Sequence, residues 1–185
     1  MEKRNKSDVT DKNITQNMGK NRSSHRIAFL GMFIAIAMVL SYVESLIPLN
    51  FAVPGIKLGL ANMVTIIVIF KMRVADAWIV AIVRVILSSI LFGNMTVMLY
   101  SLAGAFASLM VMTIFRRINF FSMVGVSILG AVCHNAGQIA MAAWLLRNSS
   151  IFYYIPVLMV SGCIAGVCIG IAGAAVIRNV HFGCF

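Results

Sequence analysis

Apolar residues fill six long stretches of the chain from Ile27 onward, with short polar or basic segments between them. A helix needs about 20 predominantly apolar residues to cross the hydrocarbon core of a bilayer. Five of the stretches approach or exceed that length, and the second is the shortest. The pattern predicts an all-α integral membrane protein, a bundle of six transmembrane helices within 27–178, with spans at about 27–47, 56–70, 74–92, 95–115, 121–146 and 151–177.

The cationic residues predict how these helices are oriented. Seven Lys and Arg lie in the tail at 1–26, and five more fall in loops or ends on the same side of the predicted membrane: Lys71, Arg73, Arg116, Arg117 and Arg178. Only Lys57 and Arg147 fall on the other side. Because Lys and Arg accumulate in cytoplasmic loops, we expect both termini, including the short tail at 179–185, in the cytoplasm. The tail at 1–26 has few large apolar residues and is predicted to be disordered.

Polar side chains interrupt the apolar stretches at a few positions. Such residues are costly inside a membrane and are often part of a ligand, ion or proton site. Given the predicted orientation, they fall in the middle or outer half of the bundle, and His134 and Gln138 share a helix face because they are four residues apart. We expect an outward-facing pocket formed by Glu44, Lys57, Asn62, Arg84, His134, Asn135 and Gln138. The alternative is that these residues only pair with one another and tie helices together.

The numbers of cationic and acidic side chains in this group indicate which kind of ligand it could bind. Lys57, Arg84, Arg147 and His134 are potential cations, and Glu44 is the one carboxylate embedded among them. This balance favours a ligand with anionic or carbonyl groups.

Small residues recur every four positions in several spans, which allows close approach of helix backbones in lipid. The longest series is Gly162, Gly166, Gly170 and Ala174, and a shorter one is Gly31 and Ala35. We expect internal packing for the first series, whereas the second is equally compatible with a contact to another subunit.

Composition excludes several other classes of protein. With 61% hydrophobic and 11% charged residues, the chain is far from a soluble globular domain. The net charge of +10 is confined to the tail and loops, so nucleic-acid binding is not expected. The four cysteines have no CxxC spacing, and no metal or cofactor is predicted.

Catalytic motifs are missing as well. The chain has no GxxxxGK[ST] motif for ATP, no HExxH or GxSxG motif, and no aspartate-rich DDxxD motif that could hold a magnesium diphosphate. We therefore predict that the protein is not an enzyme and has no catalytic residues.

Four strings carry a resemblance to a known family: PGIKLGLAN at Pro54–Asn62, RVILSSILFGN at Arg84–Asn94, SLAGAFAS at Ser101–Ser108 and GAVCHNAGQ at Gly130–Gln138. Over about residues 27–178, the chain resembles the Gx transporter family, which is widely labelled heptaprenyl diphosphate synthase component I. That family in turn resembles the substrate-binding S components of energy-coupling factor (ECF) vitamin transporters.

The resemblance implies a subunit in the plasma membrane that captures a small vitamin- or cofactor-like solute from outside. Its partners would be a transmembrane coupling subunit and two cytoplasmic ATPases, which would supply the energy. The coupling subunit would dock on small residues of the first helix, here Ala28, Gly31 and Ala35, and the loop at 48–54 would act as a lid. The family label also leaves an alternative, a noncatalytic membrane component associated with heptaprenyl diphosphate or quinone synthesis.

Overall fold

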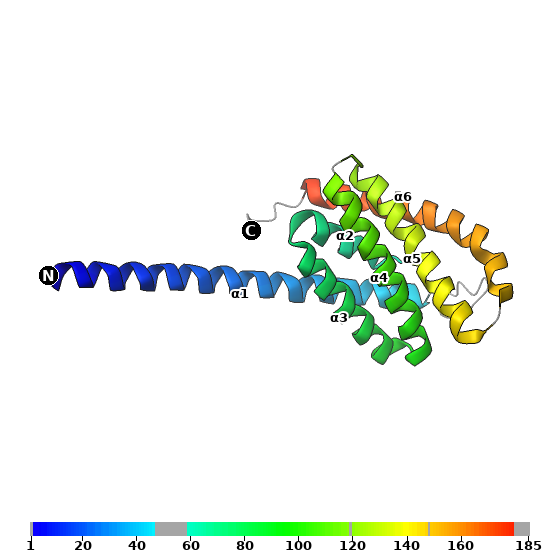
Figure 1. Cartoon of the computed structure of the whole chain (residues 1–185), viewed down its shortest axis with the longest axis horizontal. Helices are drawn as coiled ribbons and strands as arrows, with labels where there is room; N and C mark the ends of the chain where they lie inside the picture. Colours follow the sequence, from blue (N-terminus) through cyan, green and yellow to red (C-terminus); the bar gives the residue numbers. More distant parts are fainter. Residues whose placement is uncertain (1, 47–58, 119, 148, 180–185) are drawn as a thin grey trace.

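A computed structural model describes residues 2–46, 59–118, 120–147 and 149–179, and within these ranges every regular element is a helix. The chain runs back and forth through a bundle, so that α1 begins and α6 ends at the same end of the bundle (Figure 1). The elements in order are α1 (Glu2–Leu46), α2 (Asn62–Lys71), α3 (Val74–Phe92), α4 (Met95–Ile118), α5 (Met123–Leu146), the 3-10 helix η1 (Ser149–Tyr154) and α6 (Ile155–Asn179).

Five of the described helices are long and apolar enough to cross a membrane, so the protein is a multi-pass membrane protein. The predicted span at 74–92 coincides with α3, and the predicted spans at 95–115 and 121–146 correspond to α4 and α5. The predicted span at 56–70 differs most. Its described part becomes helical only at Asn62, which leaves α2 with 10 residues, too few to cross a bilayer alone.

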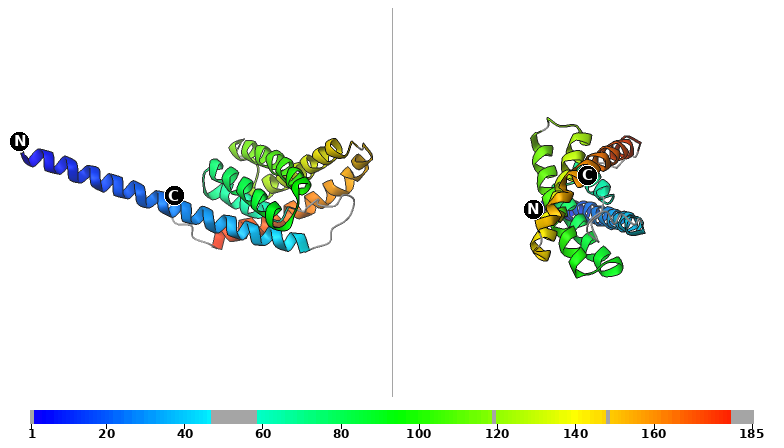
Figure 2. Two further views of the ribbon diagram at one scale, coloured as in Figure 1. Left: turned by 90° about the horizontal axis from the view of Figure 1, so that it is seen from below. Right: turned by 90° about the vertical axis from the view of Figure 1, so that its right-hand side faces the viewer.

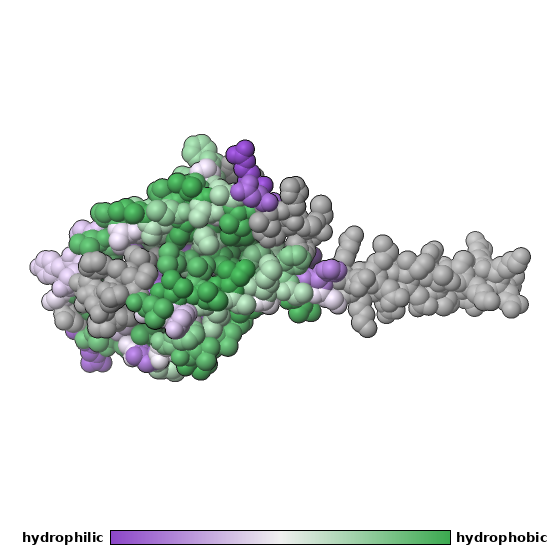
Figure 3. All heavy atoms as spheres, turned by 180° about the vertical axis from the view of Figure 1, so that it is seen from behind, coloured by the Kyte–Doolittle hydropathy of each residue, from purple (hydrophilic) through white to green (hydrophobic). Residues whose placement is uncertain are grey.

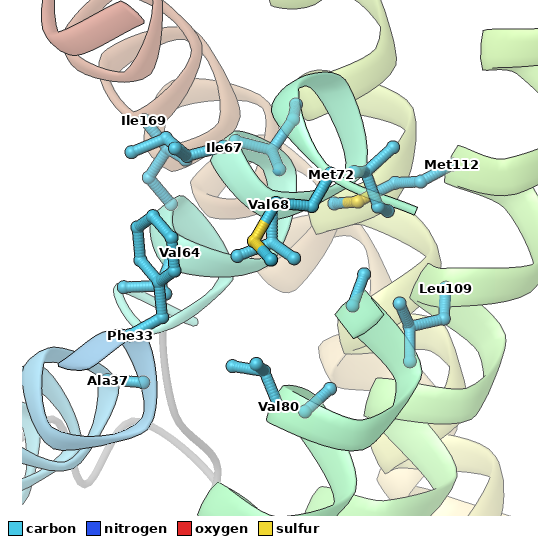
Figure 4. Packing of buried hydrophobic residues seen from close by; sticks show 14 of the residues in the cluster. Phe33, Ala37, Val64, Ile67, Val68, Met72, Val80, Leu109, Met112 and Ile169 are labelled. Carbon is cyan, nitrogen blue, oxygen red and sulfur yellow. The ribbon is translucent and has the colours of Figure 1, made fainter. Parts of the chain in front are cut away.

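The short helix α2 lies in the centre of the bundle and contacts each of the five long helices. Six successive residues from Val64 to Ile69 are buried, which is expected of a helix that is apolar on all sides and surrounded by other helices. Figure 4 shows Val64, Ile67 and Val68 of α2 among Phe33 of α1, Leu109 of α4 and Ile169 of α6. The position of α2 brings its N-terminus into the interior of the bundle.

The first helix is longer than the sequence predicts. It begins at Glu2 and continues without a break into the apolar span, so that its N-terminal part projects beyond the bundle (Figure 2). The tail at 1–26 is predicted to be disordered from its polar composition, whereas residues 2–26 are helical in the structure. No proline occurs in this segment, so nothing interrupts the backbone hydrogen bonds that extend from the apolar part of α1.

Local signals explain where several helices begin. The Ser122 hydroxyl accepts a hydrogen bond from the backbone N–H of Gly125 at 3.3 Å, and the Asn94 side-chain oxygen accepts one from Val97 N–H at 2.9 Å. These side chains satisfy backbone donors in the first turns of α5 and α4. Pro156 lies in the first turn of α6, where its missing N–H costs no helical bond.

Glycines hold α5 and α6 close together, as the small-residue series predicts. A Cβ atom at Gly166 would lie 2.6 Å from Ile128 Cα, and one at Gly170 would lie 2.7 Å from Val124 Cα. Gly162 and Gly173 are also buried, whereas Ala174 is partly exposed. The predicted series therefore packs inside the bundle, except that the buried residue at its end is Gly173 and not Ala174.

The outside of the bundle is largely apolar, with the hydrophilic side chains gathered near its ends (Figure 3). Exposed large side chains on it include Ile90, Phe106, Trp144 and Ile171. Such a surface suits contact with lipid tails, and it agrees with the lengths of the helices.

Candidate functional site

Buried polar side chains from four helices gather around the N-terminus of α2. They are Glu44 of α1, Asn62 of α2, Arg84 of α3 and His134 of α5, and each is at most 5% exposed. These residues are far apart in the sequence. Glu44 and His134 both lie next to the backbone turn at Gly59, and Arg84 contacts Asn62, which follows that turn. Burying charged groups in an apolar bundle costs free energy, so the arrangement requires an explanation in terms of partners or ligands.

Glu44 binds the backbone turn that leads into α2. Gly59 has a φ of 85°, a conformation that favours glycine, and its carbonyl oxygen accepts a hydrogen bond from Asn62 N–H at 2.8 Å. The Glu44 carboxylate accepts a hydrogen bond from Gly59 N–H and a longer one of 3.4 Å from Leu60 N–H. Since α2 has no side-chain cap of its own, Glu44 provides the negative charge that favours a helix N-terminus.

Arg84 reaches the first residue of α2. Its Nη2 atom donates a hydrogen bond of 3.2 Å to the Asn62 side-chain oxygen, and the charge of Glu44 acts on its guanidinium group. Among the described residues, no carboxylate oxygen lies within 4 Å of Arg84, and neither its Nε–H nor the Asn62 amide nitrogen has a hydrogen-bond partner. The site therefore holds a buried cation whose donors are only partly used.

Two glycines leave room for the ring of His134. A Cβ atom at Gly59 would lie 3.6 Å from His134 Cδ2 and 3.1 Å from Asn62 Nδ2, and one at Gly104 of α4 would lie 3.0 Å from His134 Cε1. The same Cβ at Gly104 would lie 2.8 Å from Gln138 Cγ. His134 is therefore flanked by the turn before α2 on one side and by α4 on the other.

Gln138 lies one helical turn beyond His134 and is fully buried. Neither its amide nitrogen nor its amide oxygen has a hydrogen-bond partner among the described residues. An unsatisfied buried amide group costs about 1 to 3 kcal/mol, so natural proteins rarely keep one without a water molecule or a ligand nearby.

Asn135 does not face this group. Its side-chain nitrogen donates a hydrogen bond of 2.8 Å to the carbonyl oxygen of Leu158 in α6, and a Cβ atom at Gly162 would lie 2.9 Å from that nitrogen. Asn135 thus connects α5 to α6, in agreement with the alternative that polar residues tie helices together. Of the predicted pocket residues, the structure brings Glu44, Asn62, Arg84, His134 and Gln138 together, directly or through Gly59 and Gly104.

The remaining predicted residues lie elsewhere. Lys57 and the predicted lid at 48–54 are outside the described residues. Arg147 is exposed at the end of α5. Gly59 and Gly104 are site residues that sequence reasoning did not single out, although both occur in the strings PGIKLGLAN and SLAGAFAS.

The basic end of the bundle has its own ion pair. Arg26 of α1 contacts the carboxylate of Asp76 in α3, with its Nε atom 3.0 Å from Oδ1. Asp76 also accepts a hydrogen bond from Arg73 N–H at 3.3 Å, in the first turn of α3. This contact connects α1 to the first turn of α3.

The three small residues predicted to dock a coupling subunit, Ala28, Gly31 and Ala35, are all exposed. A Cβ atom at Gly31 would meet nothing within 4 Å. No described helix of this chain covers that side of α1, so its small residues do not serve packing within the bundle.

Among the described residues, no group of three or more His, Cys, Asp or Glu side chains could hold a metal ion. The family model of heptaprenyl diphosphate synthase component I matches residues 33–176. This match confirms the family label expected from the four strings. No curated protein sequence and no solved structure is significantly similar to the chain.

Proposed function

We propose that this chain, a member of the heptaprenyl diphosphate synthase component I family, binds a small solute within the membrane. It acts as the substrate-binding subunit of an ECF-type uptake transporter for a vitamin- or cofactor-like molecule. The observation that carries the proposal is the convergence of buried polar residues from α1, α2, α3 and α5 at the N-terminus of α2.

The length of α2 supports this function. Ten helical residues are about 15 Å long, roughly half of the hydrocarbon thickness of a bilayer. One end of α2 carries Lys71, so its other end lies inside the bundle, where Glu44, Asn62 and Arg84 meet it. Helices that end within the membrane often form the binding sites of transporters, because their free N–H groups face the ligand.

The distribution of charge supports the orientation. Lys71 lies in the last turn of α2, Arg73 directly before α3, and Arg116, Arg117 and Arg178 in the last turns of α4 and α6, whereas Arg26 lies within α1 and contacts Asp76 of α3. The end of α2, the start of α3, the end of α4 and the end of α6 lie toward one end of the bundle (Figure 1). We place that end in the cytoplasm and the protein in the plasma membrane. The coupling subunit then docks on the exposed Ala28, Gly31 and Ala35 of α1, and two ATPases energise uptake from the cytoplasmic side.

Binding can be tested with the detergent-solubilised full chain. Small molecules that co-purify with it would be identified by mass spectrometry and their affinity measured for the wild type and for the variants Arg84→Ala and His134→Ala. We expect both variants to bind at least tenfold more weakly while remaining extractable and monodisperse. Arg117→Ala, an exposed cation at the end of α4, is the matched control. Unchanged affinity in both pocket variants would refute the site.

The family label favours one other function, a noncatalytic membrane partner in heptaprenyl diphosphate synthesis. Chain elongation by a soluble prenyl diphosphate synthase subunit would be assayed with and without this protein. Elongation that depends on this chain would support the second function, whereas solute uptake that depends on it and on ATP hydrolysis would support the first.

A further inference from the structure

The donors that surround the N-terminus of α2 define the class of ligand, provided that the proposed solute-binding function is correct. The group contains one carboxylate, Glu44, and that carboxylate is engaged by the backbone N–H groups of Gly59 and Leu60. A ligand at this place therefore does not meet a free acid. It meets hydrogen-bond donors.

Arg84 is the strongest of these donors. It is buried, it carries a positive charge, and only its bond to the Asn62 side-chain oxygen is made within the described residues. Its Nε–H has no partner there, nor has the amide nitrogen of Asn62 beside it. Both residues are at least nine-tenths buried, so these donors point into the bundle and not toward solvent.

Gly59 lies next to these donors. A Cβ atom there would lie 3.1 Å from the Asn62 amide nitrogen, closer than an ordinary van der Waals contact, so glycine lets the turn approach Asn62 closely. The amide nitrogen of Gln138 is a further unused donor on the other side of His134. An arginine side chain offers a planar set of donors that matches the two oxygens of a carboxylate or of a phosphate group.

We infer that the solute carries an oxyanion, a carboxylate or a phosphate group, which Arg84 binds together with the amide of Asn62. The charge of the ligand then offsets a buried guanidinium group that has no carboxylate within 4 Å among the described residues. The sequence leaves anionic and carbonyl ligands equally open, and the unused charged donor decides in favour of the anion.

The test uses three probes that share one ring: benzoate, phenyl phosphate and neutral benzamide. Each is titrated into the detergent-solubilised full chain while binding heat or thermal stability is recorded. We expect saturable binding of benzoate, phenyl phosphate or both, and binding of benzamide that is at least tenfold weaker. The comparison of the first two probes distinguishes a carboxylate from a phosphate ligand.

Substitutions of Arg84 test whether binding of the anionic probe depends on this residue. Arg84→Gln should weaken binding of the anionic probe roughly 10- to 100-fold, as expected for the loss of a hydrogen bond to a charged group. Arg84→Lys keeps the charge without the paired donors and should be intermediate, and it remains informative if Arg84→Gln does not fold. Arg117→Gln removes an exposed cation and should bind like the wild type.

Three results would overturn the inference: equal binding of benzoate and benzamide, no binding of either anion, or full binding of the anion by Arg84→Gln. The proposed function fails differently, through the absence of solute uptake by cells or vesicles that contain the partner ATPases. A chain that binds the anions in an Arg84-dependent manner without supporting uptake would retain the oxyanion site and lose the transport function.

Discussion

Replacement of Gly104 by alanine tests whether close approach of α4 and α5 positions the polar group. The added methyl carbon would lie 2.8 Å from both the Gln138 Cγ atom and the carbonyl oxygen of His134, and 3.0 Å from the ring atom Cε1 of His134. Carbon atoms rarely approach other heavy atoms so closely, so α4 or α5 has to move by several tenths of an ångström. The backbone carbonyl of His134 cannot avoid the contact by a rotamer change.

The expected cost follows from the packing. Additional methyl or methylene groups in a well-packed interior typically cost about 1 to 3 kcal/mol. Since alanine is favoured over glycine in a helix by about 1 kcal/mol, the net loss should be about 0 to 2 kcal/mol in stability. Solute affinity should fall more clearly, because the displaced atoms belong to His134 and Gln138 themselves.

Gly31→Ala is the matched control, because it adds the same methyl group to a helix at a position where nothing lies within 4 Å. Thermal unfolding in detergent should show Gly31→Ala at or slightly above the stability of the wild type. Binding of the co-purified solute should be unchanged in Gly31→Ala and reduced in Gly104→Ala. If the two variants have the same stability and affinity, the close approach at Gly104 does not position the site.

Substitutions at three further contacts can be tested by thermal unfolding of the purified protein. Asp76→Ala should destabilise the bundle more than Arg26→Ala, because the buried carboxylate also accepts from Arg73 N–H; equal effects would contradict this. Asn135→Ala should cost about 1 kcal/mol, since the Leu158 carbonyl still accepts from Ser161 at 3.1 Å, and no loss would argue against the connection to α6. Glu44→Ala should cost about 1 to 3 kcal/mol and Glu44→Gln less, because glutamine retains an oxygen that can accept from Gly59 N–H; equal losses would show that charge alone matters.

The long helices could be predicted because each has a continuous apolar stretch with polar residues at both ends. Val74–Phe92 agrees with its predicted span to the residue. The start of α2 could not be predicted in this way, because Leu60 and Ala61, directly before Asn62, are apolar like the residues after it. Only the positive φ of Gly59 and the hydrogen bonds of the turn separate them, and hydropathy contains neither.

The polar group was predictable in outline and not in its orientation. Their predicted depth in the membrane groups Glu44, Asn62, Arg84, His134 and Gln138, and the structure brings these five side chains together, while their binding of a solute stays a prediction. Asn135 follows His134 directly and is equally buried, but successive residues on a helix point about 100° apart, so it faces α6. Because α5 packs against α4 on one side and α6 on another, burial alone does not tell which polar side chain meets which neighbour.

The short helix α2 explains why one buried carboxylate and one buried guanidinium group coexist here without a direct ion pair between them. The turn that leads into α2 lies inside the bundle, and Glu44 accepts hydrogen bonds from the Gly59 and Leu60 N–H groups of that turn. This use of Glu44 separates it from Arg84, which is left with the Asn62 amide as its partner. The turn before α2 therefore engages Glu44, and Arg84 is left with one hydrogen-bond partner among the described residues.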